Sequence, residues 1–285
     1  MIPVKFDYTR ASSVEEAVSA LTAAGEDSKV IAGGQSLMPV LRLRLAAPTM
    51  LVDVGGVSEM RGVTDAGDHL VIGASTTHHE VMTNALVKQH APLLAMATAT
   101  VADPAIRHRG TFGGSLAHAD PAGDLPSVAA ALGATMTVAG PGGRRTVSAS
   151  EFFIDYFTSA VGPDEVLVSV SVPKLGDGWG FHYEKFHRTA QAWAIVGVAA
   201  AVKRSNGTIA EARVALTNMG TGPIRAAATE AALAGAPATA EAIGAAAERA
   251  AEGTRPTSDL HAKADYREHL ARVLTRRSVA KAAGI

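Results

Sequence analysis

The chain has 285 residues, of which 47% are hydrophobic and 19% are charged, and its formal net charge is -1 at pH 7. A chain of this length and composition can bury a large core and predicts two or three compact units. Its balanced charge argues against nucleic acid as the main partner.

The chain contains no cysteine, which excludes disulfides, thiolate metal sites and any iron–sulfur cluster ligated by this chain. If the function needs such a cluster, another chain carries it. The N-terminus, MIPVKFDYTRASS, has no apolar signal segment, and no apolar run approaches the roughly 20 residues that cross a bilayer. We therefore expect a cytoplasmic protein that is not integral to the membrane.

The first elements alternate between helix, strand and glycine turn. Ser13 precedes VEEAVSALTAAG, where apolar residues recur at helical spacing, Glu16 completes a capping box and Gly25 ends the helix. KVIA is predicted to be a short buried strand that ends at the Gly33-Gly34 turn, and MLVDV and HLVIGA are predicted to be further strands.

Helices dominate the middle of the chain. Thr77 and Glu80 form a second capping box, and PLLAMATATVA continues the helical pattern up to a second glycine pair, Gly113-Gly114. Beyond it, PSVAAALGA predicts a helix and ATMTVAGPGGRRTVS predicts a hairpin across a Pro-Gly-Gly turn.

The pattern changes at Glu165. EVLVSVSVP alternates with a period of two, and WGFHYEKFHR, AIVGVAAAVKR and TIAEARVALTNMG are predicted to extend one antiparallel sheet with it. The rest of the chain is rich in alanine and is predicted to be helical. Strands followed by helices imply an α+β C-terminal domain, with a boundary at residues 174–180.

The two glycine pairs suggest a site for phosphate. Glycine tolerates positive φ, and successive backbone N–H groups in such turns bind anions, especially where a helix follows. In the first loop (residues 33–36) Ser36 is a candidate N-cap, and the second loop (residues 111–115) offers hydroxyls at matching offsets. Neither loop matches the dinucleotide or P-loop fingerprint, and each pair taken alone is also compatible with an ordinary tight turn.

Four segments resemble the FAD-binding medium subunits of the molybdenum hydroxylases: AGGQSLMPVLRLRLAAP, IGASTTHHEV, HRGTFGGSLAHADPAGDLP and FHYEKFHRTAQAWAIVGVA. That family includes aerobic carbon monoxide dehydrogenase, xanthine dehydrogenase and bacterial N-heterocycle hydroxylases. The resemblance runs in order from FDYTRASSVEEAV to ADYREHLARVL, which is almost the whole chain. Within the family, the sequence is most similar to the medium subunit of aerobic carbon monoxide dehydrogenase.

The resemblance implies an α+β fold with two domains. Residues 1–175 would form a vanillyl-alcohol-oxidase-like, PCMH-type FAD-binding domain, with subdomains at residues 1–57 and 58–175. Residues 176–285 would form a C-terminal domain like that of the carbon monoxide dehydrogenase flavoprotein, with an antiparallel sheet and helices.

The resemblance also implies which residues bind FAD. Along the first glycine pair they are Lys29, Val30, Ile31, Ala32, Gly33, Gly34, Gln35 and Ser36. Along the second they are Thr111, Phe112, Gly113, Gly114 and Ser115, and elsewhere Val101, Asp124, Leu167 and Lys185. Phe112 departs from the family pattern, because most relatives have an aliphatic residue there, and Ala192 stands where relatives often carry an acid.

Several of these residues have a second interpretation. Asp124 precedes a helical run, so it is a candidate N-cap as well as a candidate ribose ligand. Lys185 lies in an alternating strand, where a solvated face is the simpler expectation. The histidines form no compact metal-binding set, and Ser115 lacks the second glycine of a nucleophile elbow, so we expect neither a metal site nor a catalytic residue in this chain.

The function implied by the resemblance is electron transfer. Non-covalent FAD would take electrons from two-iron two-sulfur clusters on a small subunit, after substrate oxidation at a molybdenum cofactor on a large subunit, and pass them to quinone or NAD. The likeness predicts a dimer of such heterotrimers, with any association with the inner face of the membrane made through partners. Two alternatives stay open: a medium subunit of an N-heterocycle or xanthine-type hydroxylase, and a stand-alone flavin oxidoreductase. A scaffold subunit that has lost flavin is a further possibility.

Overall fold

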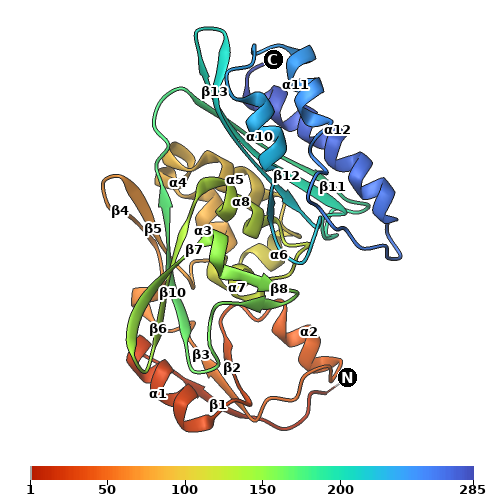
Figure 1. Ribbon diagram of the computed structural model, residues 1–285. Coiled ribbons are helices and arrows are strands. Elements are labelled where there is room, and N and C mark those ends of the chain that lie inside the picture. The colour runs from red at the N-terminus through yellow and green to blue at the C-terminus, as the bar shows by residue number, and fades with distance from the viewer. Residues whose placement is uncertain (1) are drawn as a thin grey trace.

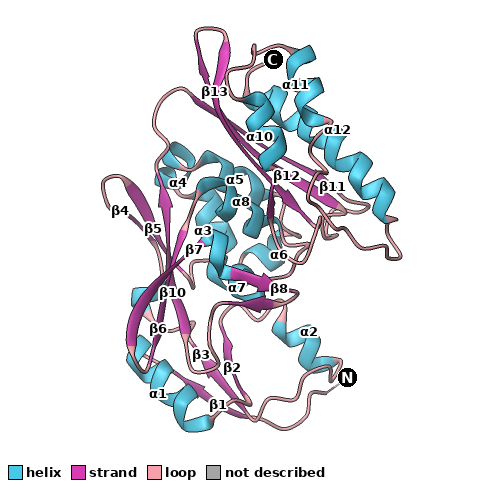
Figure 2. Ribbon diagram, viewed as in Figure 1, coloured by secondary structure: helices cyan, strands magenta, loops and turns pink. Residues whose placement is uncertain are grey.

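The computed structural model describes residues 2–285, which form a three-tiered molecule with the termini in its outer tiers (Figure 1). Helices and strands are mixed in the first two tiers, with a run of short helices between β5 and β6, and the third tier has strands followed by helices (Figure 2). The strands form sheets of three, five, four and two strands. None of the described helices is both long and apolar enough to cross a membrane.

The first tier is a small parallel sheet with one covering helix. Its strand order is β1-β3-β2, and its elements are β1 (Asp7–Arg10), α1 (Val14–Ala24), β2 (Ser28–Ile31), α2 (Leu37–Arg42) and β3 (Met50–Asp53). Ser13 caps α1 as predicted, by accepting a hydrogen bond from the Glu16 amide. The capping box is incomplete, because the Glu16 carboxylate accepts from Ser12 instead of Ser13.

The second tier is built on an antiparallel five-stranded sheet, ordered β4-β5-β10-β6-β7. Its strands are β4 (Val63–Asp65), β5 (His69–Gly73), β6 (Thr135–Gly140), β7 (Gly143–Ser148) and β10 (Val166–Pro173). The alternation of β10 is confirmed, since its four valines are buried. Its predicted partners were wrong: β10 pairs with β5 and β6 and shares no sheet with the strands that follow it.

Short helices and a small hairpin surround this sheet. They are η1 (Ser58–Met60), α3 (His78–Thr83), α4 (Ala85–His90), α5 (Pro92–Ala99), α6 (Pro104–Arg107), α7 (Phe112–His118), α8 (Asp124–Leu132), α9 (Ala149–Phe152), β8 (Phe153–Asp155) and β9 (Thr158–Ser159). The predicted capping box at Thr77 and Glu80 is confirmed at the start of α3.

The third tier is an antiparallel sheet covered by helices. It comprises β11 (Trp179–Phe186), β12 (Val196–Ser205), β13 (Thr208–Thr217), β14 (Ile224–Arg225), α10 (Ala227–Leu233), α11 (Ala240–Ala247) and α12 (Ala264–Ala282). The three helices cover one face, and α5 and α8 of the second tier lie against the other (Figure 1). Alternate residues of β12 therefore belong to different cores: Val198 faces α12, whereas Ala199 faces the second tier.

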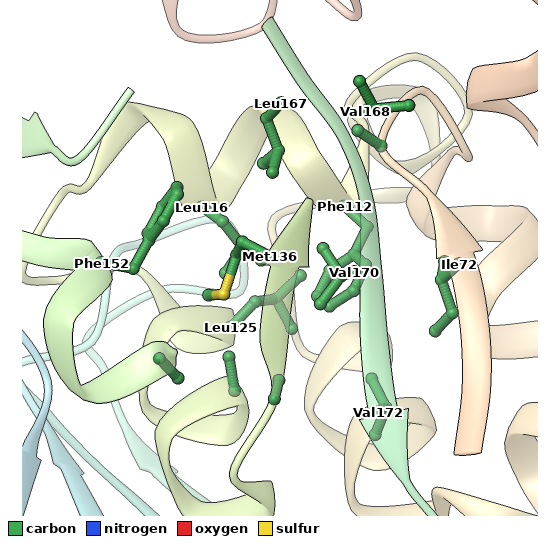
Figure 3. Packing of buried hydrophobic residues seen from close by; sticks show 14 of the residues in the cluster. Ile72, Phe112, Leu116, Leu125, Met136, Phe152, Leu167, Val168, Val170 and Val172 are labelled. Carbon is green, nitrogen blue, oxygen red and sulfur yellow. The ribbon is translucent and has the colours of Figure 1, made fainter. Parts of the chain in front are cut away.

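The larger core fills the space between the five-stranded sheet and the helices α7 and α8. Figure 3 shows Phe112, Leu116 and Leu125 from these helices packed against Met136 and Val170 of the sheet. Phe112 is only 1% exposed, and burial of a phenylalanine side chain stabilises a fold by about 1.5–3 kcal/mol. Phe112 is the first residue of α7, so its burial fixes the start of this helix against the larger core.

Candidate functional site

The two glycine loops touch one another. A Cβ at Gly33 would lie 2.2 Å from the carbonyl oxygen of Arg109 and 2.7 Å from the Cα of Gly110. Arg109 and Gly110 lead directly into the second loop. The absence of a side chain at Gly33 therefore lets the first tier and the second tier meet at this point.

The second loop is fixed to the segment that leads into α3. The His78 amide donates to the carbonyl of Gly110 at 2.9 Å, and the Phe112 amide donates to the carbonyl of Thr76 at 2.9 Å. A Cβ at Gly113 would lie 2.3 Å from the Cβ of Ala74, so this glycine also permits a close backbone approach.

The loops differ in their free backbone donors. In the second loop, four backbone amides donate to acceptors within the chain. The Phe112 and Gly113 amides donate to the carbonyls of Thr76 and Ala74, and the Gly114 and Ser115 amides donate to the hydroxyl and the carbonyl of Thr111. In the first loop, the amides of residues 33–36 donate to no acceptor within residues 2–285. Free amides for an anion are therefore present in the first loop, whereas the glycines of the second loop lie in the first turn of α7 and their amides already have acceptors.

Positive φ is needed at one of the four glycines. Gly34 has φ of 73°, whereas Gly33, Gly113 and Gly114 are absent from the positive-φ residues. Ser36 stands at the N-cap position of α2 but makes no side-chain capping hydrogen bond, so its predicted capping role is wrong. The Ser115 hydroxyl donates to the carbonyl of Phe112 at 2.8 Å, which occupies its proton within α7.

A small apolar cavity opens beside the loops. Its volume is about 80 Å³, and five of the predicted residues line it: Val30, Ala32, Gly113, Gly114 and Leu167. Met60, Ala74, Ala117, Val161 and Val166 complete most of its apolar surface. Leu167, which is 54 residues from Gly113 in sequence, is thereby placed next to the second glycine pair.

Other predicted residues lie outside this cavity. Lys29 is exposed on β2. The side chain of Ile31 packs beside Gly34, since a Cβ at Gly34 would lie 3.5 Å from Ile31 Cδ1. Phe112 points into the core, so only its backbone faces the loop region. The Gln35 side chain turns back and donates to the carbonyl of Gly33 at 3.2 Å.

Asp124 and Lys185 form a buried ion pair between the second and third tiers. The Lys185 Nζ lies 2.7 Å from Asp124 Oδ2, and the two side chains are 3% and 4% exposed. The Tyr183 hydroxyl donates to Asp124 Oδ1 at 2.7 Å, so both carboxylate oxygens are occupied by residues of β11. Lys185 also donates to the carbonyl of Thr100 at 3.2 Å, which places it beside Val101.

This pair corrects two expectations. Asp124 is not an N-cap, because α8 starts at Asp124 itself and Gly123 holds the cap position. Lys185 does not lie on a solvated face of its strand. Burial raises the pKa of the Asp124 carboxyl above its ordinary value, and the charge of Lys185 acts in the opposite direction. Sequence analysis did not assign a role to Tyr183, although its spacing of two from Lys185 puts both on one face of β11.

The residues of the site fit a dinucleotide such as FAD. The free amides of residues 33–36 can bind a diphosphate, and the apolar cavity lined in part by Gly113 and Gly114 can accept a flat ring or a sugar. Asp124 and Lys185 contact each other and line neither cavity, so their direct contact with a nucleotide has no support in the geometry.

Comparison with known proteins agrees with this geometry. Residues 4–175 match the family model described as "FAD binding domain in molybdopterin dehydrogenase", and residues 181–282 match "CO dehydrogenase flavoprotein C-terminal domain". The carbon monoxide dehydrogenase medium chain of Hydrogenophaga pseudoflava is 38% identical over 98% of this chain and 97% of its own length. The 6-hydroxypseudooxynicotine dehydrogenase complex subunit alpha of Paenarthrobacter nicotinovorans is also 38% identical, over 99% of this chain and 96% of its own.

Solved structures give the same result. The fold superimposes on a chain of the Hydrogenophaga pseudoflava carbon monoxide dehydrogenase that lacks the Mo-pyranopterin moiety of the molybdenum cofactor. The TM-score is 0.97 at 41% identity, with 100% of this chain and 99% of the other covered. The predicted α+β fold and the predicted family are confirmed. The chain belongs to the FAD-binding medium subunits of the molybdenum hydroxylases, which are FAD-dependent oxidoreductases.

Proposed function

We propose that this chain binds FAD non-covalently and serves as the electron-transfer subunit of a molybdenum hydroxylase, with aerobic carbon monoxide dehydrogenase as the first candidate. The observation that carries the proposal is the row of free amides in the first loop, held against the second loop by Gly33. Backbone N–H groups in such a turn supply a diphosphate site that needs no charged side chain.

The proposed cofactor contacts follow the two loops and the apolar cavity. The amides of residues 33–36 hold the pyrophosphate, and residues 29–32 position that turn at the end of β2. Residues 111–115 form the opposite wall, and Leu167 contacts an apolar part of the cofactor. Asp124 and Lys185 make no direct contact with the cofactor in this proposal. They position Val101 instead, since Lys185 donates a hydrogen bond to the carbonyl of the preceding residue, Thr100.

Bound FAD supplies a redox centre that exchanges electrons singly or in pairs. The chain itself holds, orients and shields it, and we assign no catalytic residue. With no cysteine in the sequence, the two-iron two-sulfur clusters belong to a small partner subunit and the molybdenum cofactor to a large one. The names of the relatives, "medium chain" and "complex subunit alpha", support such a complex. We propose a cytoplasmic dimer of heterotrimers that delivers electrons to quinone or NAD.

A second candidate has its own support. The relative from the 6-hydroxypseudooxynicotine dehydrogenase complex is as similar to this chain as the carbon monoxide dehydrogenase relative, at 38% identity. A hydroxylase of an organic substrate is therefore the alternative. The two candidates differ in the large subunit, and the role of this chain is the same in both.

Acid precipitation tests the binding mode. The purified chain should be yellow, and acid should release all of its FAD into the supernatant while the protein is pelleted. Flavin that stays with the pellet would show a covalent link, and a colourless chain that takes up no added FAD would show a scaffold subunit.

A further inference from the structure

A second, polar cavity lies where the three parallel strands of the first tier end. Its volume is about 230 Å³, and its lining includes Arg10 at the end of β1, Asp53 at the end of β3 and Gly33 after β2. Ala32 and Ser75 line both this cavity and the apolar one, so they form the wall between them. The carboxyl ends of parallel strands are a usual place for ligands in open α/β sheets. We call this space the arginine cavity.

The arginine cavity carries excess positive charge. Arg10, Arg61 and Arg109 line it, and Asp53 is its only carboxylate. Asp53 is itself engaged by neutral donors, because Oδ2 accepts from the Tyr8 hydroxyl at 2.6 Å and Oδ1 accepts from the Gly55 amide at 2.7 Å. Three arginines thus line the same cavity as one carboxylate whose two oxygens already accept hydrogen bonds, and all three arginine side chains are exposed.

The guanidinium groups lack partners of their own. Within residues 2–285, none of the three donates a hydrogen bond or joins an ion pair, whereas Arg145 on β7 is paired with Glu165 at 2.6 Å. All three side chains are exposed, so water and salt screen their mutual repulsion, and an anion bound between them would reduce that repulsion further. The lining of the arginine cavity thus offers guanidinium donors that have no acceptor within residues 2–285, together with a net positive charge.

Neighbouring groups complete a polar lining. The Thr111 hydroxyl oxygen accepts from the Gly114 amide at 3.1 Å, which leaves its proton free to donate. A Cβ at Gly56 would lie 2.9 Å from Arg10 Nε, so glycine at that position makes room for the Arg10 side chain. His108 also lines the cavity and stacks on His79, with ring centroids 3.9 Å apart.

We propose that the arginine cavity binds a phosphate group. Guanidinium groups present forked pairs of donors that match phosphate oxygens, and three of them around one space suit a dianion or a diphosphate better than a single carboxylate. The phosphate belongs either to the pyrophosphate of FAD or to a free phosphate compound. In the first case the inference rests on the proposed function, and in the second it is independent of it.

Titration calorimetry on the full chain tests the site, with inorganic phosphate and inorganic pyrophosphate as probes. Both the FAD-loaded and the FAD-stripped protein are titrated, as wild type and as Arg61→Gln, Arg109→Gln and the control Arg277→Gln, an exposed arginine of α12. The affinity of each variant for FAD is measured in parallel. Each cavity variant should weaken phosphate binding about tenfold, because it removes a charged donor group from the lining of the cavity. The control should bind as wild type does.

The two sources give different results. If the FAD-loaded protein still binds the probes and the cavity variants keep normal FAD affinity, the site serves a free phosphate compound. If only the stripped protein binds them and the cavity variants lose FAD affinity about tenfold, the site serves the cofactor. Cavity variants that match Arg277→Gln in both phosphate and FAD affinity would overturn the proposal while leaving FAD binding by the first loop intact.

Discussion

Asp124 and Lys185 are 61 residues apart in sequence, yet their charged atoms lie 2.7 Å apart in a nearly solvent-free contact between two tiers of the molecule. Removing one partner of such a pair leaves an uncompensated buried charge, which costs about 3–5 kcal/mol. The pair therefore makes docking of the third tier onto the second depend on both residues.

Asp124→Asn should reduce the free energy of unfolding by about 3–5 kcal/mol, measured by urea denaturation, because Lys185 keeps its charge without a counterion. Asp65→Asn is the control, since Asp65 pairs with Lys174 but is 42% exposed, and its loss should reduce the free energy of unfolding much less than Asp124→Asn does. The double variant Asp124→Leu, Lys185→Met should recover part of the loss. An Asp124→Asn protein as stable as the control would contradict the buried-charge account.

His78 should make the protein sensitive to acid. Burial, with a smaller effect from the charge of Arg107, lowers its pKa from 6.5 to about 4. Because the pKa of His78 is lower in the folded state, its contribution to the free energy of unfolding is fully present above pH 6.5 and is lost as the pH falls toward 4. The loss amounts to about 3 kcal/mol, at 1.36 kcal/mol per pKa unit.

The variant His78→Phe isolates this contribution. His78 Nδ1 is buried without a hydrogen-bond partner in the described chain, so an aromatic ring of similar size loses no bond at that atom. The free energy of unfolding should then change much less between pH 7 and pH 4.5 than in the wild type. An unchanged pH profile would show that other groups cause the acid sensitivity.

Valine at Gly33 or Gly113 should abolish or severely weaken FAD retention. A Cβ at Gly33 would overlap the backbone of Arg109 and Gly110 at 2.2–2.9 Å and force the two loops apart, whereas a Cβ at Gly113 would overlap Ala74 at 2.3–2.8 Å and displace the start of α7. Gly142→Val is the matched control, because nothing lies within 4 Å of its Cβ position and Gly142 is not among the positive-φ residues. Equilibrium dialysis with FAD, alongside thermal unfolding, separates lost binding from lost folding. Wild-type occupancy in both variants would remove the loops from the site.

Gln35→Ala should leave FAD affinity within about twofold of wild type, since surface substitutions usually change free energies by no more than about 0.5 kcal/mol. The Gln35 side chain donates to the Gly33 carbonyl and is not needed for the backbone amides to bind phosphate. A tenfold or greater loss would show that side chains, rather than amides, hold the cofactor in the first loop.

Local patterns were sufficient to predict local features. Ser13, the Thr77 capping box and the alternation of β10 were all predicted, because each depends on residues within one short, continuous stretch of the chain. The partners of β10 were not, since a period of two shows which side chains share a face but not which strands lie beside them.

The two glycine loops of the candidate site could be predicted from local sequence patterns. Contacts between residues that are far apart in the sequence could not. The glycine pairs located both loops, but free amides in one and occupied amides in the other depend on contacts with residues 74–76. Likewise, no local pattern indicates that Asp124 faces β11 rather than its own helix. The arginine cavity joins residues from six separate segments of the chain, and only the folded chain brings them together.

The most direct test of the account is affinity purification of this chain from its native cell, followed by metal analysis and spectroscopy under carbon monoxide. The account predicts that molybdenum, iron and FAD co-purify with the chain in a complex doubled by two-fold symmetry. Its flavin should be reduced by substrate in the complex but not in the isolated chain. A chain recovered alone, free of both metals and fully active with a small reductant, would contradict the account and establish a stand-alone flavoenzyme.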